Sequence, residues 1–176
     1  MRRRQPARLP AFDYTSPGAY FLTVCAFHRE LILGEIEGDR VLLSRLGEVA
    51  RVCWGEIPMH FAHVELDVSV VMPNHIHGII ILNESVGATH ASPLRNARGI
   101  GQVPGSLSAI VGSFKSASSR RINQLRGTPG APVWQRGFYD HVIRNDEDLA
   151  RIREYIATNP FRWSLDEENP AYSRRR

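Results

Sequence analysis

The stretch from His63 to Leu82, HVELDVSVVMPNHIHGIIIL, constrains the fold more than any other part of the chain. As far as Met72 it alternates apolar and polar residues, which is the period of a half-buried strand. Pro73-Asn74 interrupts this pattern, and the apolar run that begins at His75 predicts a further strand. The stretch therefore predicts a sheet in which one strand carries two histidines separated by a single residue.

The flanking segments add strands before this stretch and helices around it. Residues 19–27 are rich in β-branched and aromatic side chains and predict a buried strand, and 31–36 with 40–43 predict a hairpin that turns at 37–39. Apolar residues at helical spacing predict helices at about 43–57, 106–125 and 146–158, the last ending at Asn159-Pro160. This order predicts an α+β fold, with helices packed on a mainly antiparallel sheet.

The length of 176 residues fits a single domain. Between residues 83 and 106 the apolar periodicity gives way to Gly, Ser, Pro, Asn and Arg, which predicts a long loop within that domain. The N-terminus lacks the apolar segment of a secretory signal, and no apolar run approaches the roughly 20 residues of a spanning helix. We therefore expect a cytoplasmic protein, in which Cys25 and Cys53 are buried thiols rather than a disulfide.

Arginine dominates the basic residues. Lys115 is the only lysine among 22 basic residues, and the net charge is +4. Because a guanidinium donates two parallel hydrogen bonds to a phosphate, this composition favours a polyanionic partner, although GC-rich codon usage would enrich arginine in the same way. Runs of arginine at residues 2–4 and 174–176 predict basic, flexible termini, which either contact nucleic acid or remain solvated.

The two histidines of the central stretch are candidates for metal ligands. Residues i and i+2 of a strand point to the same face, so His75 and His77 would project side by side. Two imidazoles in this arrangement suit one divalent ion, although such pairs also occur on solvated strands. An ion held by only two histidines requires further ligands and leaves positions open for a substrate, as a catalytic site demands.

Four segments together resemble one known family. VMPNHIH is followed in order by SAIVGSFKSASSRRIN, VWQRGFYDHVIRN and RIREYIATNP. These segments resemble the REP-associated tyrosine transposases, which are HUH single-strand endonucleases with one catalytic tyrosine. The resemblance covers about residues 18–163 and implies a ferredoxin-like, HUH-type sandwich.

The resemblance also implies an activity and roles for individual residues. It implies a metal-dependent transposase that cleaves and rejoins single-stranded DNA next to palindromic, REP-type hairpins. Tyr155 matches the tyrosine that attacks the scissile phosphate, forming a 5′-phosphotyrosine and releasing a 3′-OH. His75 and His77 match the residues that hold Mg²⁺ or Mn²⁺, and Asn159 matches the position that completes the metal site. The implied partner is a single-stranded DNA hairpin, with a monomer favoured over a homodimer.

Helical spacing agrees with the roles given to Tyr155 and Asn159. They stand at i and i+4, on one face of a helix, although Pro160 disfavours helical geometry at the residue before it. A phenol with a pKa near 10 is a weak nucleophile, so it must converge with a metal or a base. Tyr139 is the rival nucleophile, because it would share a strand face with His141.

Contacts with DNA are expected from basic and planar side chains. The candidates for phosphate contacts are Lys115, Arg120, Arg121, Arg136, Arg3 and Arg4. Trp134, Phe138 and Tyr139 are candidates for stacking on unpaired bases, and a core position is the alternative for Trp134.

Two other functions remain open on the sequence. A domesticated protein would bind nucleic-acid hairpins without cleaving them, but such a protein is expected to lose a histidine or the tyrosine, and this chain keeps all three. A zinc hydrolase would need a third strong ligand, for which Glu65, Asp67 and His90 are candidates. Only the transposase predicts a covalent adduct between DNA and protein.

Overall fold

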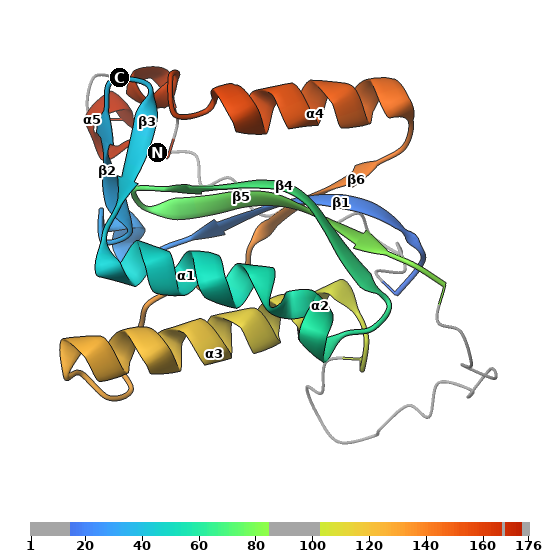
Figure 1. The fold of residues 1–176 in the computed structure, drawn as a ribbon, viewed down its shortest axis with the longest axis horizontal. Coiled ribbons are helices and arrows are strands. Elements are labelled where there is room, and N and C mark those ends of the chain that lie inside the picture. Colours follow the sequence, from blue (N-terminus) through green and yellow to red (C-terminus); the bar gives the residue numbers. More distant parts are fainter. Residues whose placement is uncertain (1–14, 85–102, 167, 174–176) are drawn as a thin grey trace.

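The centre of the fold is a four-stranded antiparallel sheet (Figure 1). The structure is a computed structural model that describes residues 15–84, 103–166 and 168–173. The strands are β1 (Gly18–Cys25), β4 (Val64–Met72), β5 (His75–Leu82) and β6 (Tyr139–Ile143). Their order is β4-β5-β1-β6, so β1 lies inside the sheet and β6 at an edge. The predicted α+β fold with a mainly antiparallel sheet is confirmed.

Two hairpins follow the sequence pattern closely. Pro73-Asn74 forms the turn between β4 and β5, and Met72 pairs with His75 across it. Strands β2 (Gly34–Glu37) and β3 (Arg40–Leu43) form a separate two-stranded sheet. Their turn contains Gly38 at a φ of 64°, a left-handed conformation that glycine adopts without strain.

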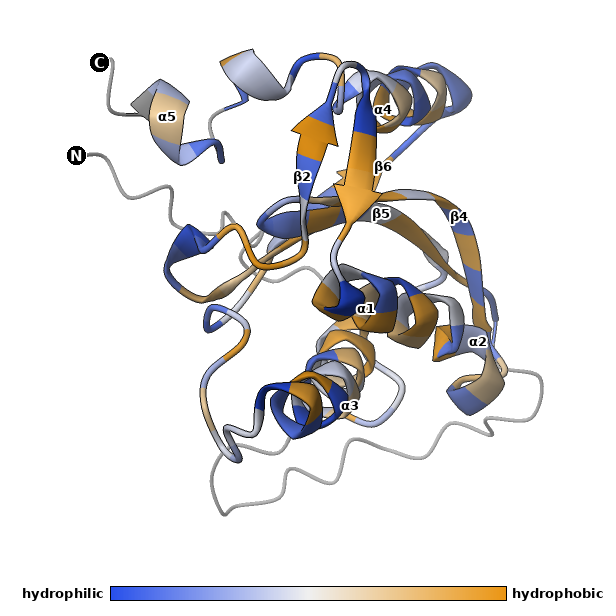
Figure 2. Ribbon diagram, turned by 60° about the vertical axis from the view of Figure 1, so that its left-hand side comes forward, coloured by the Kyte–Doolittle hydropathy of each residue, from blue (hydrophilic) through white to orange (hydrophobic). Residues whose placement is uncertain are grey.

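One face of the large sheet is covered by α1 (Arg45–Gly55), α2 (Ile57–His60) and α3 (Leu107–Arg126). Figure 2 shows α1 and α3 side by side, each with polar and apolar residues around its axis, as amphipathic helices require. Ser44 and Ser106 cap these two helices by accepting hydrogen bonds from the first-turn amides of Gly47 and Ala109. The helix predicted at 43–57 is divided, because Pro58 lies in the first turn of α2.

The main hydrophobic core lies between this face and its helices. Alternate residues of β1 and β5 enter it, including Leu22 and Ile80, which are fully buried. Trp54 of α1 meets Phe114 of α3 edge to face, with the ring centroids 5.3 Å apart. The Trp54 ring also lies so close to Gly78 of β5 that a Cβ atom at position 78 would overlap it. Only glycine therefore fits at this point of the strand.

The opposite face is covered by α4 (Asp146–Thr158), which has the predicted bounds. Asn145 caps it by accepting a hydrogen bond from the amide of Asp148. Ile152 and Ile156 of α4 pack on Phe21 and Ile79 in a second, smaller core. A short helical turn, η2 (Trp163–Leu165), and α5 (Pro170–Ser173) follow.

Several predictions concern the edges of the fold. β6 and the elements after α4 were not predicted, and η1 (Phe27–Arg29) follows β1 where the strand was expected to continue. Most of the predicted loop at 83–106 lies outside the described residues.

In the part of the chain that is described, no helix has the length and apolarity to cross a membrane. Cys53 is buried as expected and Cys25 is half-buried, and both are free thiols.

Candidate active site

Strand alternation turns both histidines of β5 toward α4. His75 and His77 lie on the same face as Ile79, whereas Ile76 and Gly78 face the main core. The two imidazoles are almost fully buried, at 0% and 2% exposure. Burial of a polar ring without partners costs free energy, so the hydrogen bonds of each ring show which nitrogen is satisfied within the protein and which is left to bind a ligand.

The hydrogen bonds of His75 fix its tautomer. Its Nδ1 lies 2.8 Å from Oδ1 of Asn74, whose amide group donates to the backbone carbonyls of Arg29 and Glu168. Oδ1 of Asn74 therefore accepts, and Nδ1 of His75 carries the proton. Nε2 is left with a lone pair, and it is buried without a hydrogen-bond partner among the described residues. This is the tautomer of a metal-ligating histidine whose second nitrogen donates to a neighbour.

His77 connects the strand to the tyrosine of α4. Its Nδ1 lies 2.9 Å from the hydroxyl of Thr23, the residue paired with it on β1. Its Nε2 lies 3.2 Å from the hydroxyl of Tyr155. Tyr155 is 40% exposed, and its ring packs edge to face with that of Phe21, with the centroids 5.9 Å apart. The tyrosine thus reaches the histidine pair from a position open to solvent.

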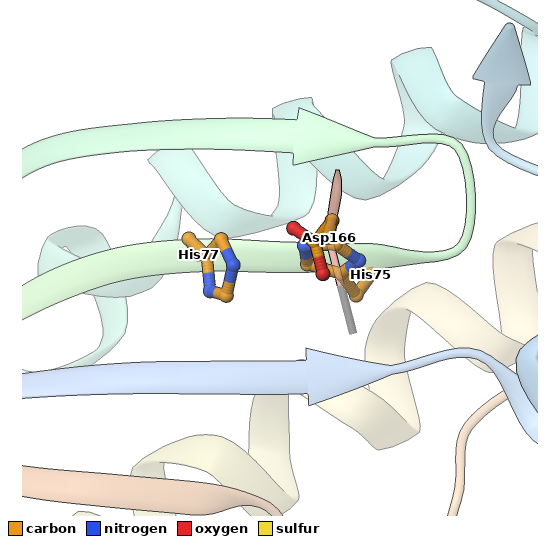
Figure 3. Close-up of side chains that lie close together, drawn as sticks. All are labelled: His75, His77 and Asp166. Atoms are coloured by element: carbon orange, nitrogen blue, oxygen red, sulfur yellow. The ribbon is translucent and has the colours of Figure 1, made fainter. Parts of the chain in front are cut away.

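Asp166 completes a group of three potential metal ligands. Its carboxylate and one ring nitrogen from each of His75 and His77 all lie within 4.8 Å of one another (Figure 3). Sequence reasoning missed Asp166, since it follows η2 outside any periodic element and lies in an acidic stretch that resembles a solvated turn. Thr23 was missed as well, although a polar residue within the apolar strand AYFLTVC was a usable signal.

Asn159 lies next to this group. Its backbone is helical despite Pro160, with φ −60° and ψ −41°, so it stays on the same helix face as Tyr155. Its Nδ2 donates to Oδ2 of Asp166 over 3.1 Å, while its Oδ1 is buried without a partner among the described residues. The site therefore holds two orphaned buried acceptors, Nε2 of His75 and Oδ1 of Asn159. Imidazole nitrogens with carboxylate and amide oxygens form a donor set that fits a divalent ion.

Burial keeps both imidazoles neutral. It lowers the pKa of His75 to about 3, and the charge of Arg29 adds to this effect. Burial also lowers the pKa of His77 well below its usual value; His75 contributes in the same direction and Asp166 opposes it. Neutral imidazoles bind metals without first losing a proton, so both rings are ready to act as ligands at neutral pH.

The rival nucleophile lies on the same face of the sheet, but it is separated from His77 by β1, because Thr23 pairs with His77 on one side and with Tyr139 on the other. Tyr139 begins β6, is 39% exposed and has its ring centroid 6.3 Å from that of Phe21. His141, two residues later, places its Nε2 2.8 Å from a carboxylate oxygen of Asp148 on α4. Among the described contacts, the tyrosine that meets the histidine pair is Tyr155.

The basic residues proposed for DNA contacts are in different settings. The ammonium group of Lys115 donates to the backbone carbonyls of Gln135 and Gly137, and burial lowers its pKa to about 8. Arg121 forms an ion pair of 2.9 Å with Glu56. Arg120 and Arg136 are exposed, whereas Arg3 and Arg4 lie outside the described residues.

The three candidate stacking residues differ in their burial. Trp134 is buried and its indole N–H donates to the hydroxyl of Ser118, so it occupies the core position considered for it. Phe138 is half-buried against the main core. Of the three, Tyr139 presents its ring to solvent.

The ligands considered for a zinc hydrolase lie elsewhere. Asp67 pairs with Arg153 of α4 at 2.7 Å, and Glu65 accepts a hydrogen bond from Asn83. Neither belongs to the group formed by the two histidines and Asp166. His90 lies outside the described residues.

Two Haemophilus influenzae proteins are similar to this chain in sequence. No family model matches the chain. An uncharacterised Haemophilus influenzae protein is 34% identical over 173 residues, which cover 95% of this chain and 93% of that protein. A second H. influenzae protein, provisionally named a REP-associated tyrosine transposase, is 50% identical over 30 residues, or 17% of each chain.

The structural comparison agrees with the resemblance read from the sequence. The solved structure of a REP-associated tyrosine transposase bound to a REP hairpin matches with a TM-score of 0.59 and 19% identity. The match covers 91% of this chain and 76% of that one. The resemblance to the REP-associated tyrosine transposases is therefore confirmed at the level of the fold. The chain belongs to the same family as the uncharacterised H. influenzae protein that is 34% identical to it.

Proposed function

We propose that this protein is a metal-dependent single-strand DNA endonuclease and transposase, with Tyr155 as its nucleophile. It cleaves and rejoins DNA next to palindromic hairpins of the REP type. One observation carries the proposal: the Tyr155 hydroxyl lies 3.2 Å from Nε2 of His77, beside a buried His-His-Asp group. A tyrosine that only packed on the sheet would not require a buried histidine pair at its hydroxyl, in which Nε2 of His75 has no hydrogen-bond partner among the described residues.

The proposed reaction is a transesterification at one phosphate. The Tyr155 oxygen bonds to phosphorus, and the bond from phosphorus to the 3′ oxygen breaks. The products are a 5′-phosphotyrosine and a 3′-OH, and the phenolic proton is replaced on the protein by the phosphoryl group while the 3′ oxygen gains a proton. Because the number of phosphoester bonds is unchanged, attack by a 3′-OH reverses the step and rejoins DNA without an external energy source.

The donor atoms that would hold a metal ion come from three elements. His75 and His77 lie on β5, Asp166 follows η2, and Asn159 at the end of α4 offers its orphaned Oδ1. A bound Mg²⁺ or Mn²⁺ would supply positive charge that polarises the scissile phosphate. The protein's own contribution is orientation: Asn74 holds His75, Thr23 holds His77, and the Phe21 ring packs against the ring of the nucleophile.

A single chain supplies every group named for this site. The Tyr155 hydroxyl and His77 meet within this chain, and we expect the protein to act as a monomer. The proposed partner is a single-stranded DNA hairpin in the cytoplasm. The exposed Arg120 and Arg136 remain candidates for contacts with its phosphates.

The decisive experiment traps the covalent intermediate. The protein is incubated with labelled hairpin DNA from its own genome, in Mn²⁺ or in EDTA, and analysed on a denaturing gel. We expect a metal-dependent labelled protein band that disappears in Tyr155→Phe and His75→Ala and still forms in Tyr139→Phe. Loss of the band in Tyr139→Phe with retention in Tyr155→Phe would assign the nucleophile to β6.

Two further outcomes would support the alternative functions. Tight retention of the hairpin on a native gel without any adduct would indicate a binding protein that does not cleave. DNA cleavage in Zn²⁺ without an adduct would indicate a hydrolase, in which Asp166 would be the third protein ligand. Either result would overturn the transposase proposal.

A further inference from the structure

A cleft of about 380 Å³ opens beside Tyr155 on the α4 face of the sheet. Phe21 of β1, Tyr139 and His141 of β6, and Arg151 and Tyr155 of α4 line it. Its volume is at the lower end of the roughly 300–1,000 Å³ found for small-ligand pockets, which suits one nucleotide rather than a duplex. Because β6 is an edge strand, the cleft lies at the open side of the sheet.

The floor of the cleft is aromatic. Phe21 lies at its centre, and Tyr139 and Tyr155 each meet the Phe21 ring edge to face, with centroids 6.3 and 5.9 Å away. Tyr139 and Tyr155 are each about two-fifths exposed and both line the cleft, so both are accessible to a ligand. An unpaired nucleobase stacks on aromatic rings without regard to sequence, because every base has a π face.

Two arginines, Arg151 and Arg162, line the cleft. Arg162 lies just beyond α4 and is exposed, and it forms no ion pair with any described residue. Asp148 is engaged by both His141 and Arg151, and these contacts lower the pKa of its carboxyl. Glu154 is the acidic side chain of the lining, whereas Asp148 lies outside it. A guanidinium beside an aromatic floor suits a nucleotide, whose base stacks while its phosphate pairs with arginine.

We propose that this cleft binds the unpaired nucleotide adjacent to the scissile phosphate, with its base stacked on Tyr139 and its phosphate near Arg162. The inference rests on the proposed function, because Tyr155 is shared between the cleft and the histidine pair. It also gives Tyr139 a role as a stacking residue instead of a nucleophile. The nucleotide that enters the cleft is placed within reach of the hydroxyl that attacks its neighbouring phosphate.

The test uses a fluorescent base whose emission is quenched by stacking. Hairpin DNA with a single-stranded tail carries 2-aminopurine at one tail position at a time, and it is bound to the full chain carrying Tyr155→Phe, which keeps the ring but cannot form the adduct. We expect strong quenching at one position. Adding Tyr139→Leu should remove that quenching and weaken tail-dependent binding about 5- to 150-fold, whereas adding Tyr139→Phe should preserve the quenching.

Two controls separate the cleft from general effects. Phe161→Ala removes a ring that is 76% exposed and does not line the cleft, so it should leave quenching and affinity unchanged. Arg162→Gln should weaken binding and reduce its salt dependence without abolishing the quenching. Circular dichroism and urea unfolding verify that Tyr139→Leu is folded, which is expected because Tyr139 lies at the sheet edge and leucine still covers Phe21.

The outcomes distinguish this inference from the proposed function. Unchanged quenching and affinity in Tyr139→Leu, or quenching at no tail position despite tight hairpin binding, would overturn the role of the cleft. If the protein with Tyr155 intact forms no adduct but Tyr139→Leu abolishes quenching, the cleft binds the nucleotide and the cleavage proposal is the part that fails.

Discussion

The two faces of the large sheet are built from the same strands and bury opposite kinds of residue. Toward α1 and α3, alternate residues of β1 and β5 are apolar, including Leu22 and Ile80, and they join a continuous core. Toward α4, the same strands present Thr23, His75 and His77 next to a cluster of only four buried apolar residues. The first face has the composition of a folding core, whereas the second gives up apolar burial to hold polar groups in fixed positions.

The largest expected effect separates chemistry from stability on the α4 face. Tyr155→Phe removes the hydroxyl that contacts His77 and leaves the ring that packs on Phe21. Adduct formation should fall at least about 1,000-fold, while the free energy of unfolding changes by no more than about 1 kcal/mol, the value of one hydrogen bond. Gel assays and urea unfolding measure the two quantities. A large loss of stability would mean that this tyrosine is structural.

Two neighbouring isoleucines provide a direct test of the difference between the faces. Ile79 and Ile80 are both fully buried, but Ile80 enters the main core and Ile79 the small cluster under α4. We expect Ile80→Ala to cost an amount in the upper half of the roughly 2–5 kcal/mol range for such truncations, and Ile79→Ala an amount in the lower half. Urea denaturation at pH 7.5 gives both values. Equal costs would show that the α4 face contributes as much to folding as the other.

The affinity for metal tests whether the α4 face is organised for an ion. Asp166→Asn removes the negative charge of the His-His-Asp group and should weaken Mn²⁺ binding about 10- to 100-fold, as measured by calorimetry or electron paramagnetic resonance. Asp67→Asn is the matched control, because Asp67 pairs with Arg153 outside that group. The reverse pattern would place the third ligand on β4.

The smallest expected effect is the pH dependence of stability that comes from Lys115, a half-buried residue of α3. Burial lowers the pKa of Lys115 to about 8 from 10.5, so the folded state disfavours its charged form. The unfolded chain therefore binds more protons between pH 8 and 10.5, and the stability of the wild type relative to Lys115→Met should rise with pH in that window. From pH 7.5 to 9 the expected gain is about 1 kcal/mol. Urea midpoints for both proteins test this; a constant difference would mean that the carbonyls of Gln135 and Gly137 keep the ammonium charged.

Long periodic segments could be predicted from the sequence because one physical pattern dominates each of them. α4 has the bounds that its apolar spacing predicts, and β5 begins and ends where the apolar run does. β6 was not predicted because it has only five residues and neither of its faces is uniformly apolar. One face carries Tyr139 and His141, and the other carries Asp140 and Val142. In a strand at a sheet edge, neither face needs to be uniformly apolar, so the alternation is lost.

The candidate site could be predicted only in part, because only some of its residues belong to local patterns. The histidine pair and the helical spacing of Tyr155 and Asn159 are local features, and the structure brings these side chains together between β5 and α4. Asp166 reaches the site through a turn after η2, and Thr23 through pairing of β1 with β5. Such contacts depend on tertiary arrangement, which residue spacing along the chain does not encode.

Gly78 connects the two faces in a way that bears on how such proteins diverge. The position directly after His77 must remain without a side chain because the indole of Trp54 fills that space from the other side. A substitution in the main core that moved this indole toward Gly78 would press on the backbone of β5, the strand that carries His77. Natural variation in apolar residues of the main core therefore offers relatives a route to a changed histidine geometry, even when His75, His77 and Tyr155 are all preserved.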